Sequence, residues 1–493
     1  MKRYIRTVLL SGSLLLGVIS VSSCSLDPKE SNRVDNQKDP IKTVAQLSAG
    51  LLGSYSRMTS ELYYGRDIII FSESRTPYCY SEGNTGRFHL VSGFDLQVNH
   101  AYPADTWSQI YKVIINTNRV LLADIANDGA VVDRIKGEGY VMRALAHYDL
   151  LRLYGEQYVG NKGLNALGIP YVTQFGESHP KVVRATVGEN MKSIFEDLNT
   201  GISLMEKSSS KSGSKVMINL AAAYGIKSRI ALFFAHYDSS LYDVVAENAA
   251  LAIENRGNVE VVPRPGFLDS YKTEGVGSNS LFELAQSGVD NKGVNSLRYI
   301  YSTTGDVGYG DVRWNTLTPV SEYFPEMENG EIVDDVRKDV LGTVSTILFN
   351  VGKYTRMDSN VKILRIEEVM FNYMEAALKG SSKANKATAL DYLNEIVGKR
   401  VLLKDPDNPK DSGTPKQYST IDFDILKKER TRELMFEGVG FEDVMRWEGK
   451  VRNVKTEALL AAKEVKYGDA LTVFPIPQSE INVSKIEQNQ AYK

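Results

Sequence analysis

Hydrophobic positions recur every three or four residues through most of this chain, and this period is typical of helices that bury one face. In the stretch 137–155, GEGYVMRALAHYDLLRLYG, apolar residues occupy almost every face of the predicted helix. Only a narrow strip around Arg143 and His147 is polar. A helix that is apolar on nearly all sides is buried on several sides. We therefore expect a central helix packed between other helices.

The same period predicts further helices along the chain. Their expected ranges are 43–58, 105–125, 187–207, 220–237, 242–254, 365–379, 386–403 and 424–447. Helices that follow one another across short polar turns pack as antiparallel hairpins. The expected fold class is therefore all-α, with helical hairpins, long loop excursions and minor short β-strands.

Two long stretches, 63–103 and 259–360, lack a sustained helical period and are rich in aromatic residues and glycine. Long irregular segments in a compact domain are more often functional than accidental. An exposed aromatic ring suits the binding of hydroxylated rings, with polar side chains at its edge. The candidate ligand-binding residues are Tyr78, Tyr80, Tyr301, Tyr309 and Trp314, with Arg313 and Asn315 as polar partners. The alternative is that these aromatic side chains seal the loops onto the body, and we assign Trp107 to a helix core.

Composition narrows the function classes. The chain has 493 residues, of which 42% are hydrophobic, so it can bury a large core. Its 58 Lys and Arg residues against 61 Asp and Glu residues give a formal net charge of −3, which offers no electrostatic basis for binding nucleic acid. The 27 tyrosines against 3 tryptophans favour recognition of polar or ring-shaped ligands.

The first residues are typical of a bacterial lipoprotein signal peptide. Lys2 and Arg3 precede an apolar core at 8–21, and small residues then lead to Cys24. We predict a signal peptide at 1–23, lipidation of Cys24 and a flexible tether at 24–40. The remaining cysteine, Cys79, then has no partner for an internal disulfide.

Catalytic motifs are absent from the sequence. The five histidines, His89, His100, His147, His179 and His236, form no HExxH motif and have no metal-ligand spacing. No nucleophile elbow and no phosphate-binding loop is present. We therefore predict a binding protein that is not an enzyme, and we assign no cofactor and no metal-ligating residue.

Several segments are similar to the SusD/RagB family of nutrient-binding outer-membrane lipoproteins. The segments are GEGYVMRALAHYDLLRLYG at 137–155, IEEVMFNYMEAAL at 366–378, ERTRELMFEGVGFEDVMRW at 429–447 and FPIPQSEIN at 474–482. In the third, charged residues of both signs recur at spacings of 3 to 6 (Arg430, Glu433, Glu437, Asp443, Arg446), which predicts ion pairs that are buried as a matched set. Together with the N-terminal pattern, the resemblance covers nearly the whole mature chain.

The resemblance implies a frame of tetratricopeptide-like hairpins in a single domain, 41–493. Its expected parts are a helical-repeat part at about 41–256, a loop-rich insert at about 257–360 and a C-terminal part at about 361–493. It further implies a lipid-anchored protein of the outer membrane, facing the exterior, that passes an oligosaccharide to a SusC-type TonB-dependent transporter. The alternatives are a RagB-like subunit that binds peptides, and a helical scaffold that binds only proteins.

Overall fold

The computed structural model describes residues 40–81, 85–126, 129–175, 182–208, 213–272, 275–303, 308–452 and 464–493. The expected signal peptide, the lipidation site Cys24 and the tether up to residue 39 lie outside these residues. Within the described ranges, no helix has both the length and the apolar character that a membrane span needs.

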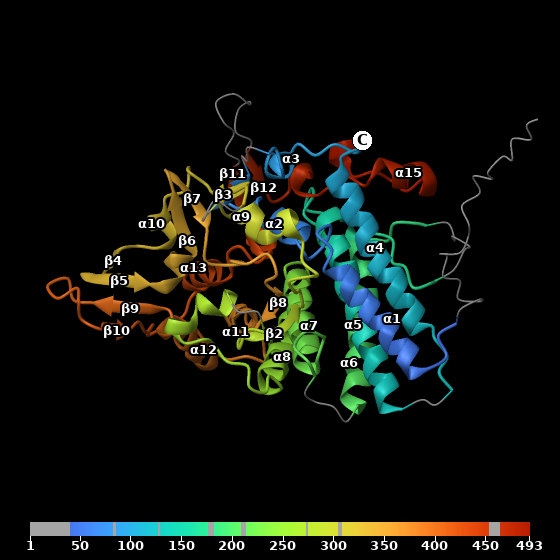
Figure 1. Cartoon of the computed structure of the whole chain (residues 1–493), viewed down its shortest axis with the longest axis horizontal. Coiled ribbons are helices and arrows are strands. Elements are labelled where there is room, and N and C mark those ends of the chain that lie inside the picture. Colours follow the sequence, from blue (N-terminus) through green and yellow to red (C-terminus); the bar gives the residue numbers. More distant parts are fainter. Residues whose placement is uncertain are drawn as a thin grey trace, which may run out of the picture.

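Paired helices form the N-terminal half of the molecule, and α1, α4, α5 and α6 stand side by side (Figure 1). The bounds are α1 (Val44–Met58), α4 (Ala101–Leu121), α5 (Ala130–Tyr154), α6 (Val187–Lys207), α7 (Leu220–Ala235) and α8 (Leu241–Glu254). The pairs α4–α5, α5–α6 and α7–α8 pack against each other, so the predicted all-α hairpin fold is confirmed. Trp107 on α4 is buried as expected.

Capping boxes fix where two of these helices begin. The hydroxyl of Thr43 accepts a hydrogen bond from the backbone N–H of Gln46 (3.2 Å), and the hydroxyl of Thr186 accepts one from the N–H of Glu189 (3.1 Å). In both cases the third residue's side chain accepts a hydrogen bond from the backbone N–H of the threonine. The predicted range 187–207 therefore coincides with α6.

Helix α5 is the centre of the helical stack. Every residue from Val141 to Tyr154 is buried, which confirms the predicted central helix. The polar residues of α5 have partners inside the protein. Arg143 donates two hydrogen bonds to the carboxylate of Asp197 on α6 (2.7 and 2.6 Å), and Arg152 forms an ion pair with Glu442 (2.9 Å). These contacts satisfy charges that would otherwise be costly to bury.

The stretch 63–103 is more regular than predicted. It contains α2 (Asp67–Glu73), β1 (Cys79–Ser81) and α3 (His89–Ser92). All seven residues of α2 are buried, including Asp67, Ser72 and Glu73, so this short helix has no solvent-exposed face. Without an exposed face there is no amphipathic period, and the prediction of an irregular segment was wrong for this reason.

Short strands appear in the insert, in agreement with the minor short β-strands of the expected fold class. An antiparallel pair joins β2 (Ser280–Leu284) to β8 (Val361–Arg365). A four-stranded antiparallel sheet projects at the end of the molecule opposite α1 (Figure 1), in the order β10 (Thr414–Pro415), β9 (Val401–Lys404), β5 (Glu331–Asp335) and β4 (Met327–Glu328). The other insert elements are α9 (Leu297–Tyr301), β3 (Val312–Trp314), α10 (Val320–Tyr323), β6 (Leu341–Val344) and β7 (Ile347–Asn350).

The C-terminal part corrects two helix predictions. Its helices are α11 (Ile366–Leu378), α12 (Lys386–Gly398), α13 (Phe423–Leu434), α14 (Gly440–Arg446) and α15 (Gln478–Ser484). The helix predicted at 386–403 ends at Gly398, because the residues that follow pair with β5 as β9. The single helix predicted at 424–447 is broken between α13 and α14.

The carboxylate of Glu73, at the end of α2, stabilises the break between α13 and α14. It accepts hydrogen bonds from the backbone N–H groups of Phe436 (2.8 Å), Gly438 (2.8 Å) and Gly440 (3.3 Å). Those N–H groups point at the carboxylate and not at carbonyl groups of a continuing helix. The partner that ends α13 is therefore more than 350 residues away in the sequence.

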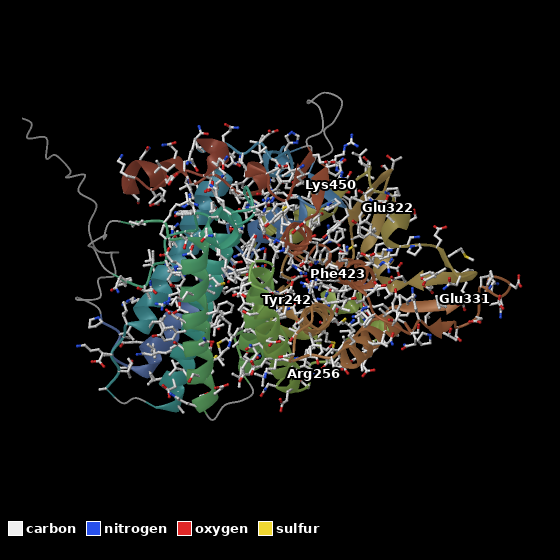
Figure 2. The ribbon with its side chains drawn as sticks, turned by 180° about the vertical axis from the view of Figure 1, so that it is seen from behind. Tyr242, Arg256, Glu322, Glu331, Phe423 and Lys450 are labelled. Carbon is white, nitrogen blue, oxygen red and sulfur yellow. The ribbon has the colours of Figure 1, made fainter. Side chains whose placement is uncertain are left out.

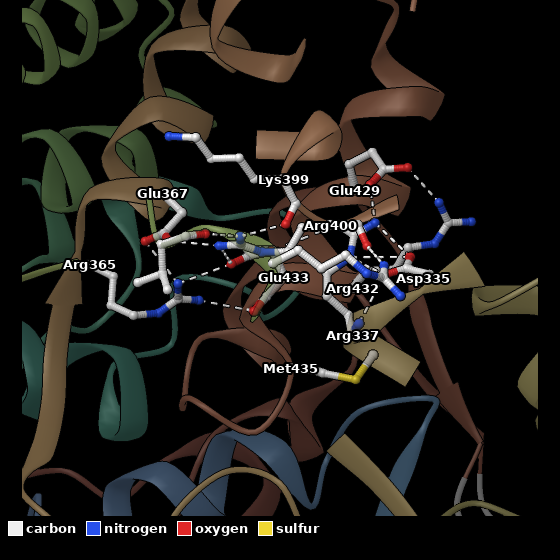
Figure 3. A network of polar contacts seen from close by, with 12 residues as sticks. Asp335, Arg337, Arg365, Glu367, Lys399, Arg400, Glu429, Arg432, Glu433 and Met435 are labelled. Atoms are coloured by element: carbon white, nitrogen blue, oxygen red, sulfur yellow. Dashed lines mark hydrogen bonds and ion pairs between the residues drawn. The ribbon is translucent and has the colours of Figure 1, made fainter. Parts of the chain in front are cut away.

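A buried network of ion pairs ties the C-terminal helices to the insert (Figure 3). Glu433 on α13 pairs with Arg365 (3.1 Å) and Arg400 (3.0 Å), and Glu429 pairs with Arg337 (2.7 Å). In each of these pairs both side chains are at most 1% exposed.

The predicted burial of the motif's charges is confirmed, but only some of these charges pair with other residues of the motif. Asp443 pairs with Arg430 (2.6 Å) and Arg446 (2.8 Å) of the same motif. Glu433 and Glu437 instead pair with Arg365, which lies at the end of β8.

Candidate functional site

A two-stranded ladder brings together the two loop regions from which the candidate ligand residues were chosen. Strand β1 pairs antiparallel with β3, so that Tyr80 lies opposite Arg313 and Cys79 lies opposite Trp314. The backbone N–H of Asn315 extends the pairing to the carbonyl of Tyr78 (2.8 Å). Residues more than 200 positions apart in the sequence therefore form one local structure.

Six of the seven candidate residues are buried in this structure, namely Tyr78, Tyr80, Tyr301, Arg313, Trp314 and Asn315. Several of their polar atoms bind within the protein. The hydroxyl of Tyr78 donates to Glu73 (2.9 Å), and the indole N–H of Trp314 donates to the carbonyl of Thr318 (2.7 Å). The hydroxyl of Tyr301 donates to the carbonyl of Phe436 (3.2 Å). These contacts correspond to the alternative in which loop aromatics pack onto the body, and ligand binding by these six residues stays a prediction.

The seventh candidate, Tyr309, is different because its side chain reaches the surface. It is 36% exposed, and no other Phe, Trp or Tyr of the described residues is as exposed. Its ring lies 5.6 Å from the ring of Tyr299, centroid to centroid, and the guanidinium carbon of Arg87 lies 4.8 Å from its centroid. We call these three side chains the tyrosine–arginine surface. Such contacts hold an exposed ring in a defined orientation.

Backbone contacts fix the position of Tyr309. Its N–H donates to the carbonyl of Tyr299 (2.7 Å), which closes the end of the loop onto α9. The next residue, Gly310, has φ +58°, and a Cβ there would lie 2.6 Å from Phe349. Only glycine fits this left-handed and crowded position without strain. The ring is therefore presented by a backbone that is closely packed on its inner side.

Asp311 joins the loop of Tyr309 to the loop of Arg87. Its carboxylate accepts a hydrogen bond from the hydroxyl of Thr85 (2.6 Å), and its carbonyl accepts one from Ser81 (3.0 Å). The same Ser81 hydroxyl lies 2.6 Å from the carbonyl of Arg87. Burial raises the pKa of Asp311, and the hydrogen bond from Thr85 opposes this shift.

Sequence reasoning missed two members of this surface. Tyr299 is the first residue of the run YIYSTTGDVGYGDVRW, which lies in one of the two aromatic-rich stretches. Its spacing of ten residues from Tyr309 is the sequence signal that could have identified it. Arg87 carried no such signal, because its place beside Tyr309 depends on the pairing of β1 with β3.

The geometry of the tyrosine–arginine surface is that of a binding surface. Among the described residues, no three His, Cys, Asp or Glu side chains are grouped as a metal site requires. The exposed ring, the guanidinium group beside it and nearby hydroxyl groups are the chemistry of a recognition surface. The expected absence of enzyme activity stays a prediction.

Two family models match the chain. One, described as "Starch-binding associating with outer membrane", matches residues 79–232, and one described as "SusD family" matches residues 349–492. Together these ranges span more than half of the chain. The chain is also 22% identical over 362 residues to SusD-like protein P2 of Formosa agariphila, which covers 70% of this chain and 67% of that protein.

Solved structures share the whole fold. A putative sugar binding protein from Bacteroides vulgatus superposes with a TM-score of 0.78 at 22% identity, over 92% of this chain and 100% of that one. Surface glycan-binding protein A from Bacteroides fluxus superposes with a TM-score of 0.71 at 20% identity, over 92% and 100%. The matched models, the relative and the hairpin architecture agree, and the chain belongs to the SusD/RagB family.

Proposed function

We propose that this protein captures an oligosaccharide at the tyrosine–arginine surface. The observation that carries the proposal is the exposed ring of Tyr309, held by Tyr299 and Arg87 in the fold of a glycan-binding family. A sugar ring has an apolar face of C–H groups, which packs against an aromatic ring. Its edge carries hydroxyl groups that accept hydrogen bonds from a guanidinium group.

Arg87 has donors to spare for such hydroxyl groups. Its Nη1 donates to the carbonyl of Val294 (3.0 Å), and no carboxylate of the described residues forms an ion pair with it. A guanidinium group has five N–H donors, so contacts to Val294 and to the Tyr309 ring leave several of them. Arg87 can therefore both orient the ring and bind the edge of a sugar that packs on it.

The ligand class and the residue are tested together by a glycan array followed by calorimetric titration of residues 41–493. Tyr309→Ala removes the ring and should weaken binding of the best array ligand by at least about tenfold, because buried aromatic contacts dominate binding energy. Tyr309→Phe keeps the ring and should bind nearly as the wild type does. Leu52→Ala is the surface control, since Leu52 is 51% exposed on α1.

Equal binding by Tyr309→Ala and the wild type would place the ligand elsewhere and end the proposal for this surface. Binding of peptides by the wild type, with no oligosaccharide bound, would establish the peptide alternative. A protein that retains neither ligand and co-purifies only with other proteins would be a scaffold.

The cellular role that we propose is delivery of the captured glycan to a SusC-type TonB-dependent transporter, from a lipid anchor on Cys24. Family membership supports this role, and the N-terminal pattern supports the anchor. Mass spectrometry of protein purified from outer membranes should find an acylated N-terminal Cys24, and gentle solubilisation should retain a large β-barrel partner. Cys24→Ala should remove both acylation and outer-membrane retention, and unchanged retention would contradict the anchor.

A further inference from the structure

A groove of about 600 Å³ runs between α1 and α4. The two helices lie side by side at the end of the molecule opposite the projecting sheet, and Figure 2 shows them from behind, with Glu331 labelled on the sheet. The floor of the groove lacks side-chain bulk, because Ala49, Gly50 and Gly53 face it from α1. The groove shares no residue with the tyrosine–arginine surface, and the proposed function does not use it.

The chain enters this groove directly before α1. Pro40 and Ile41 both line it, and Pro40 is the first of the described residues. Ile41 is 6% exposed, and its Cδ1 lies 3.4 Å from the position that a Cβ would take at Gly50. Ile41 therefore folds back over α1. The predicted tether joins the body at the groove itself.

The lining of the groove is polar and positively charged. Its charged residues are Lys42 and Arg119, and no carboxylate of the described residues belongs to it. Lys42 is exposed and forms no ion pair with a described carboxylate. Helix α1 has no acidic residue in its first turn, so nothing there neutralises the partial positive charge of its N-terminus. The groove therefore favours a segment that carries carboxylates.

The five residues before Pro40 have a matching pattern. Their sequence, at 35–39, is DNQKD. Side chains of an extended chain alternate between two sides, so the two aspartates and the glutamine share one side and the lysine lies on the other. An extended segment can therefore turn both carboxylates towards Lys42 and Arg119 and its own lysine towards water.

The lengths of the groove and the segment also agree. The lining runs along α1 from Gln46 to Gly53, which is about 10 Å at the helical rise per residue. An extended chain advances about 3.3 Å per residue, so the segment 35–39 is long enough to fill the groove. Because the segment belongs to the same chain, its effective concentration at the groove is high and a weak interaction is sufficient.

We infer that residues 35–39 dock in the groove between α1 and α4, with Asp35 and Asp39 facing Lys42 and Arg119. Docking leaves residues 25–34 between the predicted lipid anchor and the body. For a flexible chain, this shortens the r.m.s. reach of the tether from about 21 Å to about 17 Å. The docked segment thus holds the body closer to the membrane. The inference does not depend on where a ligand binds, so it can fail separately from the proposed function.

The test is disulfide cross-linking in residues 25–493, where the only native thiol, Cys79, is 1% exposed. Gln37→Cys combined with Ala49→Cys in the groove should form an intramolecular disulfide under mild oxidation. Gln37→Cys combined with Leu52→Cys is the matched control, because Leu52 is 51% exposed on α1 but does not line the groove. The groove pair should cross-link several times faster than the control pair, whereas a freely moving segment would reach both equally.

Charge reversal tests the ion pairs of the docked segment. Lys42→Glu should slow cross-linking of the groove pair about threefold, which is the size of effect expected for an exposed ion pair. Lys112→Glu makes the same charge change on an exposed residue of α4 outside the groove and should leave the rate unchanged. High salt concentration should slow the groove pair as Lys42→Glu does. Thermal unfolding checks that each variant is folded.

Equal rates for the groove and control pairs would overturn the inference, and so would equal rates in Lys42→Glu and Lys112→Glu. A second measurement is the reaction of Ala49→Cys with a maleimide. Replacing residues 35–39 by glycine and serine should speed this reaction. An unchanged rate, with protection of Ala49→Cys only when a β-barrel partner is bound, would make the partner the occupant of the groove and contradict the inference.

Discussion

His147 lies at the centre of α5, and its contacts define the state of its ring. The imidazole stacks on Tyr171 with the centroids 3.8 Å apart. Its Nε2 lies 3.0 Å from the backbone N–H of Val172, and its Nδ1 lies 2.9 Å from the carbonyl of Arg143. Because Nε2 must accept from an N–H and Nδ1 must donate to a carbonyl, the ring is neutral and carries its proton on Nδ1.

The neutral ring predicts a specific response to acid. Burial lowers the pKa of His147 to about 3, although the bond to the Arg143 carbonyl opposes this. The unfolded chain has a histidine pKa of about 6.5, so the folded state binds fewer protons between these values. The contribution of His147 to stability is complete above pH 6.5 and is lost as the pH falls towards 3. In NMR spectra of the ring nitrogens, His147 should stay in one neutral tautomer from pH 8 to 5, and a titration midpoint near 6 would contradict this.

Single residues also show where sequence reasoning about the site succeeds and fails. Tyr309 and Trp314 lie in the same aromatic loop, and the sequence marks them equally. Trp314 is buried because β3 pairs with β1, whereas Tyr309 stays exposed before the strand begins. Whether each of these side chains is exposed depends on the pairing of β3 with β1, which are more than 200 residues apart in the sequence. No local sequence pattern encodes that pairing.

At the scale of elements, the break between α13 and α14 depends on backbone geometry at Gly438. Its φ is +84°, and a Cβ there would lie 2.9 Å from the Cα of Ile69 on α2. Both features favour glycine.

Gly438→Ala should therefore destabilise the protein by more than the left-handed conformation alone requires, which is on the order of 1 kcal/mol. The matched control is Gly380→Ala, where φ is +87° but no atom lies within 4 Å of the added Cβ. The measurement is the urea dependence of circular dichroism for both variants. Equal destabilisation would mean that contact with α2 plays no part in ending α13.

Elements whose borders are encoded locally were predicted well. Helix α6 has a capping box at Thr186 and a regular apolar period, and its predicted and observed bounds coincide. The break at Phe436–Val439 and the buried helix α2 were not predicted, because each depends on the other through Glu73. Local patterns encode amphipathic helices, but they do not encode a helix end that a distant carboxylate creates.

At the scale of the molecule, the buried ion network joins the insert to the C-terminal helices (Figure 3). Glu433 is its most connected carboxylate, with Arg400, Arg365 and Arg337 as partners. Removing it takes one carboxylate partner from three buried guanidinium groups, and breaking a buried ion pair costs roughly 3–5 kcal/mol. Glu433→Ala should lower the free energy of unfolding by about this amount, and Asp269→Ala, which breaks an exposed pair with Lys272, by less than about 1 kcal/mol.

The effect of Glu433→Ala should depend on pH in a defined direction. Burial alone would raise the pKa of Glu433, but the guanidinium groups of Arg400, Arg365 and Arg337 more than offset this and hold it below its usual range. A carboxyl group with a lowered folded-state pKa contributes stability above its unfolded pKa of about 4.3 and loses it as the pH falls. The difference between wild type and variant should shrink below pH 4, and a difference that grows in acid would contradict the network.

The helical hairpins were predictable because they repeat one local pattern, whereas the site was not. The sequence marked both loop regions, and the structure places Tyr80 of one and Trp314 of the other on one ladder. Which of those rings faces outward follows from contacts between distant segments, such as the hydrogen bond from Tyr301 to the carbonyl of Phe436. The tyrosine–arginine surface is therefore a property of the assembled molecule.

The most direct test is a crystal structure of residues 41–493 soaked with the oligosaccharide that binds most tightly on the array. A sugar ring should pack in van der Waals contact with the side chain of Tyr309, with a hydroxyl group within hydrogen-bond distance of Arg87. Density for the sugar at another place, with Tyr309 bare, would contradict the account.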